Sequence, residues 1–253
     1  MNQKNAAAST IDPEDVARFS AVAAEWWDMQ GPFAPLHKFT PVRLKLIREW
    51  LSDHFGLPDS ARIPFDGLKL LDIGCGGGLI SEPLTRLGAS VTGIDADART
   101  IGTARLHAEQ TGLDINYRAC LAEELAAEMP GAFDVVIASE VIEHVADPGL
   151  FAASLAKLVR PGGAVFVTTL NRTMKSLLFG KFAAEYVLRW VPAGTHDWSQ
   201  FLTPEELGGL LSEAGLVPAE KTGIRFDPLG DSFERSSDLG INYAMLAVRP
   251  ETA

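Results

Sequence analysis

A glycine-rich turn between an apolar run and a helical pattern constrains this 253-residue chain more than any other feature. The turn spans 72–78 with the sequence DIGCGGG and follows the apolar run 68–71. Its glycines let the backbone turn tightly and approach a ligand without interference from a Cβ atom. Asp95 ends a second apolar run, where a carboxylate can accept hydrogen bonds from both hydroxyls of a ribose. The pattern indicates a nucleoside-cofactor site at the ends of two parallel strands.

The spacing of the glycines identifies the class of cofactor. A dinucleotide fingerprint, G-x-G-x-x-G/A, needs a small third residue so that the helix can close onto the strand. Counted from Gly74, that position is Leu79, so the dinucleotide pattern fails. An acid followed by alternating glycines is instead typical of Rossmann-like methyltransferases that use S-adenosylmethionine. The alternative is a structural turn without a ligand, and Asp72 together with Asp95 argues against it.

Composition and charge restrict the possible functions. Acidic residues outnumber basic ones 33 to 22, which gives a net charge of −11. Binding to nucleic acid needs a clustered basic surface, so no nucleic-acid substrate is expected. Cys75 and Cys120 supply neither a disulfide framework nor metal-ligand spacing, which favours a cytoplasmic protein. No signal peptide is visible, and no apolar run reaches the roughly 18 residues of a spanning helix.

The order of the expected elements predicts an α/β fold of Rossmann-like class I, with a seven-stranded, mostly parallel sheet. Strand and helix patterns alternate with short connections, which predicts one methyltransferase domain over 67–253. The expected strands are 68–73, 89–94, 114–118, 133–138, 164–169 and an antiparallel edge pair at 217–223 and 242–249. The expected helices in this domain are 79–87, 97–111, 121–128, 147–159 and 203–214.

The region before the sheet is predicted to be a helical N-terminal addition. Residues 1–10 are small and polar, which predicts a disordered tail, and 11–66 is expected to form a substrate lid. Pro13 marks the start of a first helix. Pro41 is expected to open a second helix that ends near Leu51.

Several strand ends should meet at one cofactor site, because ligands of such sheets bind outside the carboxyl ends of the strands. We expect the glycine loop to face the methionyl and ribose part of the cofactor, and Ala96 and Leu121 to flank the adenine. The residues expected from this topology to bind the cofactor are Asp72, Gly74, Gly76, Asp95, Ala96 and Ser139.

The segment 139–145, SEVIEHV, is the candidate for chemistry. In a helical turn, Glu140, Glu143 and His144 would share one face. Three such ligands can hold a divalent cation, whereas Glu143 and His144 can also act as a catalytic base. The alternative is a capped turn in which His144 only binds backbone.

The segment 172–190 reverses the charge of the chain locally, with four basic residues and one acid, 4 − 1 = +3. A basic amphipathic helix with aromatic residues suits an anionic membrane interface. The alternative is a helix that packs over the active site with its basic side chains in water. We therefore treat 172–200 as a lid or membrane-facing insertion.

The flanking motifs resemble those of the O-methyltransferases of ubiquinone biosynthesis, from about residue 11 onward. The motifs are FSAVA at 19–23, EWWD at 25–28, PLHK at 35–38, PVRL at 41–44, LDIGCGGG at 71–78, SEVIEHV at 139–145, TLNR at 169–172, AEY at 184–186, VPAGTHDW at 191–198 and NY at 242–243. The resemblance implies methyl transfer from S-adenosylmethionine to a phenolic oxygen of a polyprenylated catechol or demethylubiquinol.

The resemblance also implies roles for individual residues. By the family's pattern, the cofactor contacts are Arg43, Gly74, Asp95 and Ser139. The same pattern assigns a magnesium ion to Glu140, Glu143 and His144. We expect the ring and the isoprenoid tail to be lined by Trp26, Trp27, Phe182 and Trp198. An apolar tail places the substrate in the bilayer, so we expect peripheral contact of 172–190 with the inner face of an anionic membrane. Membership of a ubiquinone-biosynthesis assembly is a further expectation.

Two other functions stay open at this point. One is methylation of a soluble small molecule, which would go with a polar lid and no membrane binding. The other is a cofactor-binding scaffold without catalysis. A candidate base beside an intact glycine loop argues against the scaffold.

Overall fold

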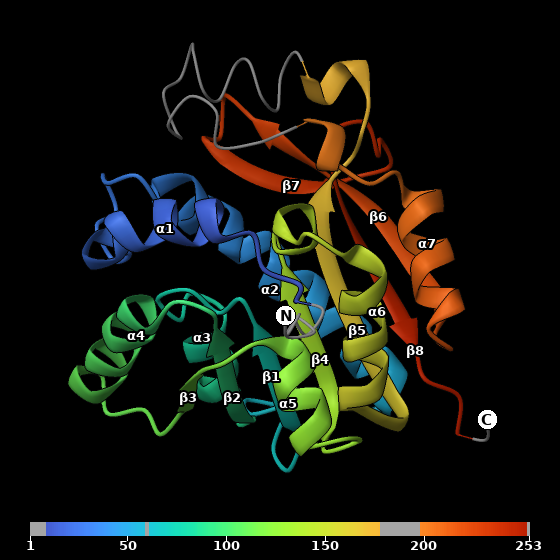
Figure 1. The fold of residues 1–253 in the computed structure, drawn as a ribbon, viewed down its shortest axis with the longest axis horizontal. Helices are drawn as coiled ribbons and strands as arrows, with labels where there is room; N and C mark the ends of the chain where they lie inside the picture. The colour runs from blue at the N-terminus through green and yellow to red at the C-terminus, as the bar shows by residue number, and fades with distance from the viewer. Residues whose placement is uncertain (1–8, 59–60, 178–197, 252–253) are drawn as a thin grey trace, which may run out of the picture.

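The computed structural model describes residues 9–58, 61–177 and 198–251. In this part of the chain an eight-stranded sheet has the order β3-β2-β1-β4-β5-β8-β6-β7 (Figure 1). Strands β1 to β5 pair in parallel, and β8, β6 and β7 complete the sheet in antiparallel register. The strands are β1 (Lys69–Ile73), β2 (Ser90–Asp95), β3 (Asn116–Ala119), β4 (Phe133–Ser139), β5 (Val159–Leu170), β6 (Val217–Asp227), β7 (Ser232–Ser236) and β8 (Asn242–Val248).

Helices cover both faces of the sheet because successive residues of the central strands point to opposite faces. Val136 of β4 belongs to the core beneath α5, α6 and α7, while Val135 belongs to the core beneath α2 and α3. The helices are α1 (Pro13–Ala21), α2 (Ala34–Phe55), α3 (Ser81–Arg86), α4 (Ala98–Gln110), α5 (Ala122–Glu128), α6 (Pro148–Leu158) and α7 (Pro204–Glu213). In the described part of the chain, no helix is both long and apolar enough to cross a bilayer.

The strand order reverses at β1, whose neighbours are β2 on one side and β4 on the other. Ile73 near the end of β1 lies opposite Ile94 of β2 and Ala138 of β4. The carboxyl ends of these three strands therefore meet at a topological switch point, where α/β sheets bind their ligands.

The sheet has one strand more than predicted. β6 continues to Asp227 and folds back into β7, which pairs with it from Gly223–Ser236 to Asp227–Ser232. β7 was missed because it is short and half-exposed and has no clear alternation of apolar residues. The hairpin packs against α2.

The prediction that Pro41 opens the second helix was wrong. α2 begins at Ala34, with Pro35 in its first turn, and Pro41 lies inside it. A proline inside a helix removes one backbone hydrogen bond. The helix tolerates the loss of this bond because it has 22 residues and its apolar side packs on the sheet.

The N-terminal segment is anchored from Thr10, which lies inside the predicted disordered tail of 1–10. Thr10 is 3% exposed, and its N–H and hydroxyl donate to the two carboxylate oxygens of Glu123 at 2.9 and 2.7 Å. Ile11 forms an antiparallel bridge with Val145, just after β4. α1 follows and packs against α4 (Figure 1). The first residues of the N-terminal segment are thus tied to the turn that carries the candidate chemistry.

Candidate functional site

A cavity of about 790 Å³ opens at the carboxyl ends of β1, β2 and β4, beneath the N-terminal helices. Most of the residues expected at the site line it. They are Arg43, Asp72, Gly74, Asp95, Ala96, Ser139, Glu140 and His144, together with Leu121. Gly76 and Glu143 do not line it. The topology argument therefore places the correct strand ends together, but not every residue on them.

Asp95 and the glycine loop are joined by a hydrogen bond. The Gly76 N–H donates to Asp95 Oδ2 at 3.1 Å, and the Asp97 N–H donates to Asp95 Oδ1 at 2.9 Å. Burial raises the pKa of Asp95, and these backbone donors oppose that rise. The carboxylate is therefore oriented by the backbone at the edge of the cavity, which fits a ribose.

Asp72 lies below the glycine loop and is 2% exposed. It accepts a hydrogen bond from Ser81 Oγ at 2.6 Å. Burial raises the pKa of Asp72 to about 6, against the opposing effects of Ser81 and Arg43. At neutral pH the carboxylate is therefore ionised, although the fold around it disfavours the charge.

An Asp72→Asn variant is expected to be more stable than the wild type at pH 7.5, by up to about 3 kcal/mol. The folded carboxyl group keeps its proton to higher pH than the unfolded one, so wild-type stability falls as pH rises from about 4 to about 6. Asparagine removes that loss and can still accept from Ser81. Thermal unfolding at pH 5 and 7.5 measures the effect, and a stabilisation that is equal at both pH values would contradict it.

Arg43 connects α2 to the end of β4. It is 3% exposed, and its Nη1 donates to Ser139 Oγ at 2.8 Å while Nη2 donates to Thr40 Oγ1 at 2.7 Å. Burial lowers the pKa of Arg43 to about 10, so the guanidinium stays charged at pH 7. Its Nε is buried without a hydrogen-bond partner. The charge and the unused donor fit a carboxylate in the cavity.

The segment after β4 is not an α-helical turn, so the expected common face does not form. Glu140 has a φ of +57°, and a short 3₁₀ helix, η2 (Ile142–His144), follows. His144 lines the cavity, with its ring edge-on to Phe19 at a centroid distance of 5.5 Å. Glu143 is 4% exposed and accepts from Thr169 Oγ1 at 2.7 Å. Glu140 and His144 thus line the same cavity, whereas Glu143 does not.

The geometry does not favour the predicted magnesium site. In the described part of the chain, no three His, Cys, Asp or Glu side chains are grouped to hold a metal ion. Glu140 Oε1 and Glu143 Oε1 are buried without hydrogen-bond partners, and burial raises the pKa of both carboxyl groups. The structure thus shows no assembled set of ligands for the ion, and the magnesium assignment stays a prediction.

The structure places the aromatic residues expected along the substrate path in different surroundings. Trp26 lines the cavity, whereas Trp27 stacks on His107 of α4 instead. Trp198 donates from Nε1 to the carbonyl oxygen of Thr173 at 3.0 Å and does not line the cavity. Phe182 lies outside the described residues. Among the described residues of this set, Trp26 thus lines the cavity, and the substrate path itself stays a prediction.

An aromatic group in the lining of the cavity was not predicted. Phe39 of α2 lies edge-on to Phe233 of β7 at 4.8 Å between centroids, and Phe226 of β6 lies 5.2 Å from Phe233. All three line the cavity. Because β7 itself was not expected, the sequence held no signal that would have brought Phe233 to this place.

The described end of the basic segment is largely neutralised. Arg172 pairs with Glu206 and also donates to the carbonyl oxygen of Phe201 at 3.1 Å. Lys175 pairs with Asp238. Lys181, Arg189 and the rest of 178–197 lie outside the described residues.

Comparison with known proteins identifies the family. A family model described as a methyltransferase domain matches residues 43–221. The ubiquinone biosynthesis O-methyltransferase of Caulobacter vibrioides is 58% identical over 240 residues, with 95% of each chain covered. The chain belongs to the ubiquinone biosynthesis O-methyltransferase family. The member from Cereibacter sphaeroides is 52% identical, with 96% of this chain and 99% of its own covered.

Solved structures show that this family member has the class I methyltransferase fold. Magnesium protoporphyrin IX methyltransferase from Synechocystis, solved with bound S-adenosylhomocysteine, has a TM-score of 0.60 at 19% identity, with 93% of both chains covered. A methyltransferase from Thermotoga maritima has a TM-score of 0.60 at 18% identity, covering 92% of this chain and 98% of its own. The protein is an S-adenosylmethionine-dependent O-methyltransferase.

Proposed function

We propose that the protein methylates phenolic hydroxyls of polyprenylated catechol and demethylubiquinol intermediates in ubiquinone biosynthesis. The names of its relatives support the pathway. The observation that carries the proposal is the cavity, whose lining includes both Gly74 of the glycine loop and the aromatic residues Phe39, Phe226 and Phe233. A charged cofactor suits the polar lining at the strand ends, and an apolar chain attached to a ring suits the aromatic lining.

In this proposal the cofactor lies across the ends of β1, β2 and β4. Asp95 accepts from the ribose hydroxyls, and Arg43 binds the methionyl carboxylate with its unused Nε–H. The rest of the cofactor-binding part of the cavity is lined by Gly74, Asp72, Ala96 and Ser139. S-adenosylmethionine supplies an electrophilic methyl group on sulfur when bound.

His144 is the proposed base. A phenol has a pKa of about 10, so its oxygen must lose a proton to become a good nucleophile at neutral pH. His144 lines the cavity and accepts that proton, while the carboxylate of Glu143 supports the resulting positive charge from its buried position. The phenolate oxygen then forms a bond to the methyl carbon as the carbon–sulfur bond breaks, which leaves S-adenosylhomocysteine.

Magnesium, which the family resemblance implies, is kept as a separate proposal. Its support is the pair of unpartnered carboxylate oxygens on Glu140 and Glu143. Since these groups and His144 are not gathered around one point, no step of the mechanism depends on the ion. Addition of EDTA to a methyl-transfer assay tests whether the ion is needed. Loss of activity that magnesium restores would support the ion.

Contact with a membrane and with other ubiquinone-biosynthesis proteins extends the proposal. The support is the positive charge of 172–190 and an apolar acceptor that prefers the bilayer. Flotation with vesicles that contain anionic lipid measures the contact. Absence of binding at low salt would refute the membrane part.

The substrate proposal predicts a difference between acceptors with and without an isoprenoid tail. A Phe233→Ala variant is expected to raise KM for a short-chain demethylubiquinol roughly ten-fold, because a buried aromatic contact with the tail is lost. KM for a catechol without a tail should stay the same. Methyl transfer from labelled S-adenosylmethionine measures both values.

The control for this experiment is Leu229→Ala, on the same hairpin. Leu229 is 97% exposed and does not line the cavity. An equal rise in KM for both acceptors in Phe233→Ala would show that the isoprenoid tail does not contact Phe233. No methylation of any catechol by a protein that still binds the cofactor would favour a soluble substrate or a non-catalytic scaffold.

A further inference from the structure

A second polar cluster lies next to the glycine loop, and the transfer mechanism does not use it. Its centre is Glu82 of α3, whose side chain is 0% exposed. Glu82 Oε1 is 2.5 Å from His107 Nδ1, and Oε2 accepts from Arg86 Nη2 at 2.9 Å. Burial of a carboxylate is unfavourable unless it is hydrogen-bonded, so these partners are required. They also hold the imidazole ring of His107 in one orientation.

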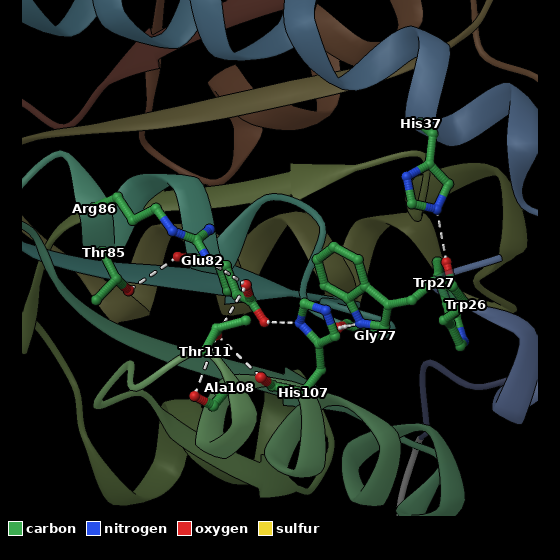
Figure 2. A network of polar contacts seen from close by, with 11 residues as sticks. Trp26, Trp27, His37, Gly77, Glu82, Thr85, Arg86, His107, Ala108 and Thr111 are labelled. Atoms are coloured by element: carbon green, nitrogen blue, oxygen red, sulfur yellow. Dashed lines mark hydrogen bonds and ion pairs between the residues drawn. The ribbon is translucent and has the colours of Figure 1, made fainter. Parts of the chain in front are cut away.

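The oriented imidazole ring of His107 stacks on the indole ring of Trp27. The His107 and Trp27 rings are parallel to within 7°, with centroids 3.5 Å apart. Trp27 Nε1 also donates to the carbonyl oxygen of Gly77 at 3.0 Å. Figure 2 shows the indole beside His107, with its hydrogen bond to Gly77 of the glycine loop as a dashed line. A lid side chain thus joins α4 to the loop that receives the cofactor.

The preceding tryptophan lies on the same loop. Trp26 stacks on Phe33 at 3.8 Å and covers Gly76 and Gly77 so closely that a Cβ atom on either would fall 2.4–2.5 Å from it. Its carbonyl oxygen accepts from His37 Nε2 at 2.8 Å, which also appears in Figure 2. The two tryptophans therefore dock the lid directly on the loop backbone.

The contact between Trp27 and the glycine loop also affects Asp95, the proposed ribose-binding carboxylate, through the backbone of the loop. Trp27 fixes the Gly77 carbonyl, and the adjoining Gly76 N–H points at Asp95 Oδ2 at 3.1 Å. A loop held in this way has its donor and acceptor groups in place before the cofactor arrives. Preorganisation of this kind strengthens binding because less order has to be created on association.

We propose that Glu82, His107 and Trp27 form a clamp that docks the N-terminal lid and sets the glycine loop for S-adenosylmethionine. His107 is a positioning residue in this clamp: it controls cofactor affinity without touching the cofactor. It does not line the cavity. When the clamp is released, a smaller fraction of the protein has the binding-competent loop, and apparent affinity falls by that fraction.

Direct binding of S-adenosylhomocysteine to the full chain, measured by calorimetry, tests the clamp. His107→Ala is expected to weaken binding roughly three- to ten-fold, which matches the loss of one aromatic stack. His107→Phe keeps the stack but loses the hydrogen bond to Glu82, so it should recover part of the affinity. His107→Gln keeps a hydrogen bond to Glu82 but loses the stack, so it should resemble His107→Ala. No methyl acceptor is present, so the result does not depend on the proposed substrate.

Controls separate positioning from general stability. Leu106→Ala changes an exposed neighbour on α4 and should bind normally. Kinetically, His107→Ala should raise KM for S-adenosylmethionine by the same factor while kcat at saturating cofactor stays within two-fold. Unchanged affinity in His107→Ala or His107→Gln would overturn the clamp. Equal weakening by His107→Phe and His107→Ala would overturn the role of the stack. If His107→Ala does not fold, the comparison of His107→Phe with His107→Gln decides.

Discussion

A His144→Ala enzyme is expected to turn over roughly 10²- to 10⁴-fold more slowly than the wild type, which is the usual contribution of a positioned general base. His144 lines the cavity beside Phe19, whereas the neighbouring carboxylate of Glu143 is turned toward Thr169. Removal of the imidazole would therefore remove the proposed proton acceptor. Affinity for S-adenosylhomocysteine should change little, because the substitution removes none of the groups proposed to hold the cofactor.

Single-turnover methylation of a short-chain demethylubiquinol measures the effect. The matched control is His54→Ala, since His54 binds the carbonyl oxygen of Gly162 at 3.0 Å and does not line the cavity. Raising the pH should partly restore the His144→Ala enzyme, because more of the phenol then ionises without a base. Near-wild-type turnover of His144→Ala at pH 7 would show that deprotonation does not depend on this residue.

Gly76→Ala should reduce affinity for S-adenosylhomocysteine by a factor on the order of 100. Gly76 has a φ of +53°, which an L-residue adopts only with strain. Its new Cβ atom would also fall 2.4 Å from the ring of Trp26, so the lid or the loop must move. Either movement disturbs the N–H that points at Asp95.

Gly112→Ala is the matched control for this substitution. Gly112 has a φ of +67°, but nothing lies within 4 Å of the position of its Cβ atom. The two variants therefore share the backbone strain and differ in the contact with the lid. Calorimetry should show normal cofactor binding in Gly112→Ala. Similar affinity in both variants would mean that the lid does not need to rest on the glycine loop.

Local features of the fold were predictable from the sequence. The glycines at 74 and 76 have positive φ, as expected for a loop that turns sharply between a strand and a helix. Thr203 and Glu206 form the capping box that opens α7. Each of these features depends on interactions within a few residues, so the neighbouring sequence alone predicts it. Parallel pairing then placed Asp72, Asp95 and Ser139 at one edge, because βαβ connections leave few alternatives.

The tertiary structure decided which side chains meet. Whether Glu140 and His144 share a face depended on one residue of left-handed backbone before η2, which no local signal announced. Trp27 and His107 stack across 80 positions of sequence, and Phe39 meets Phe233 across 194. Such contacts arise only when the lid and the edge hairpin pack on the sheet. The sequence by itself thus determined the fold class, the family and the cofactor loop, and tertiary packing determined the lid clamp and the aromatic lining of the cavity.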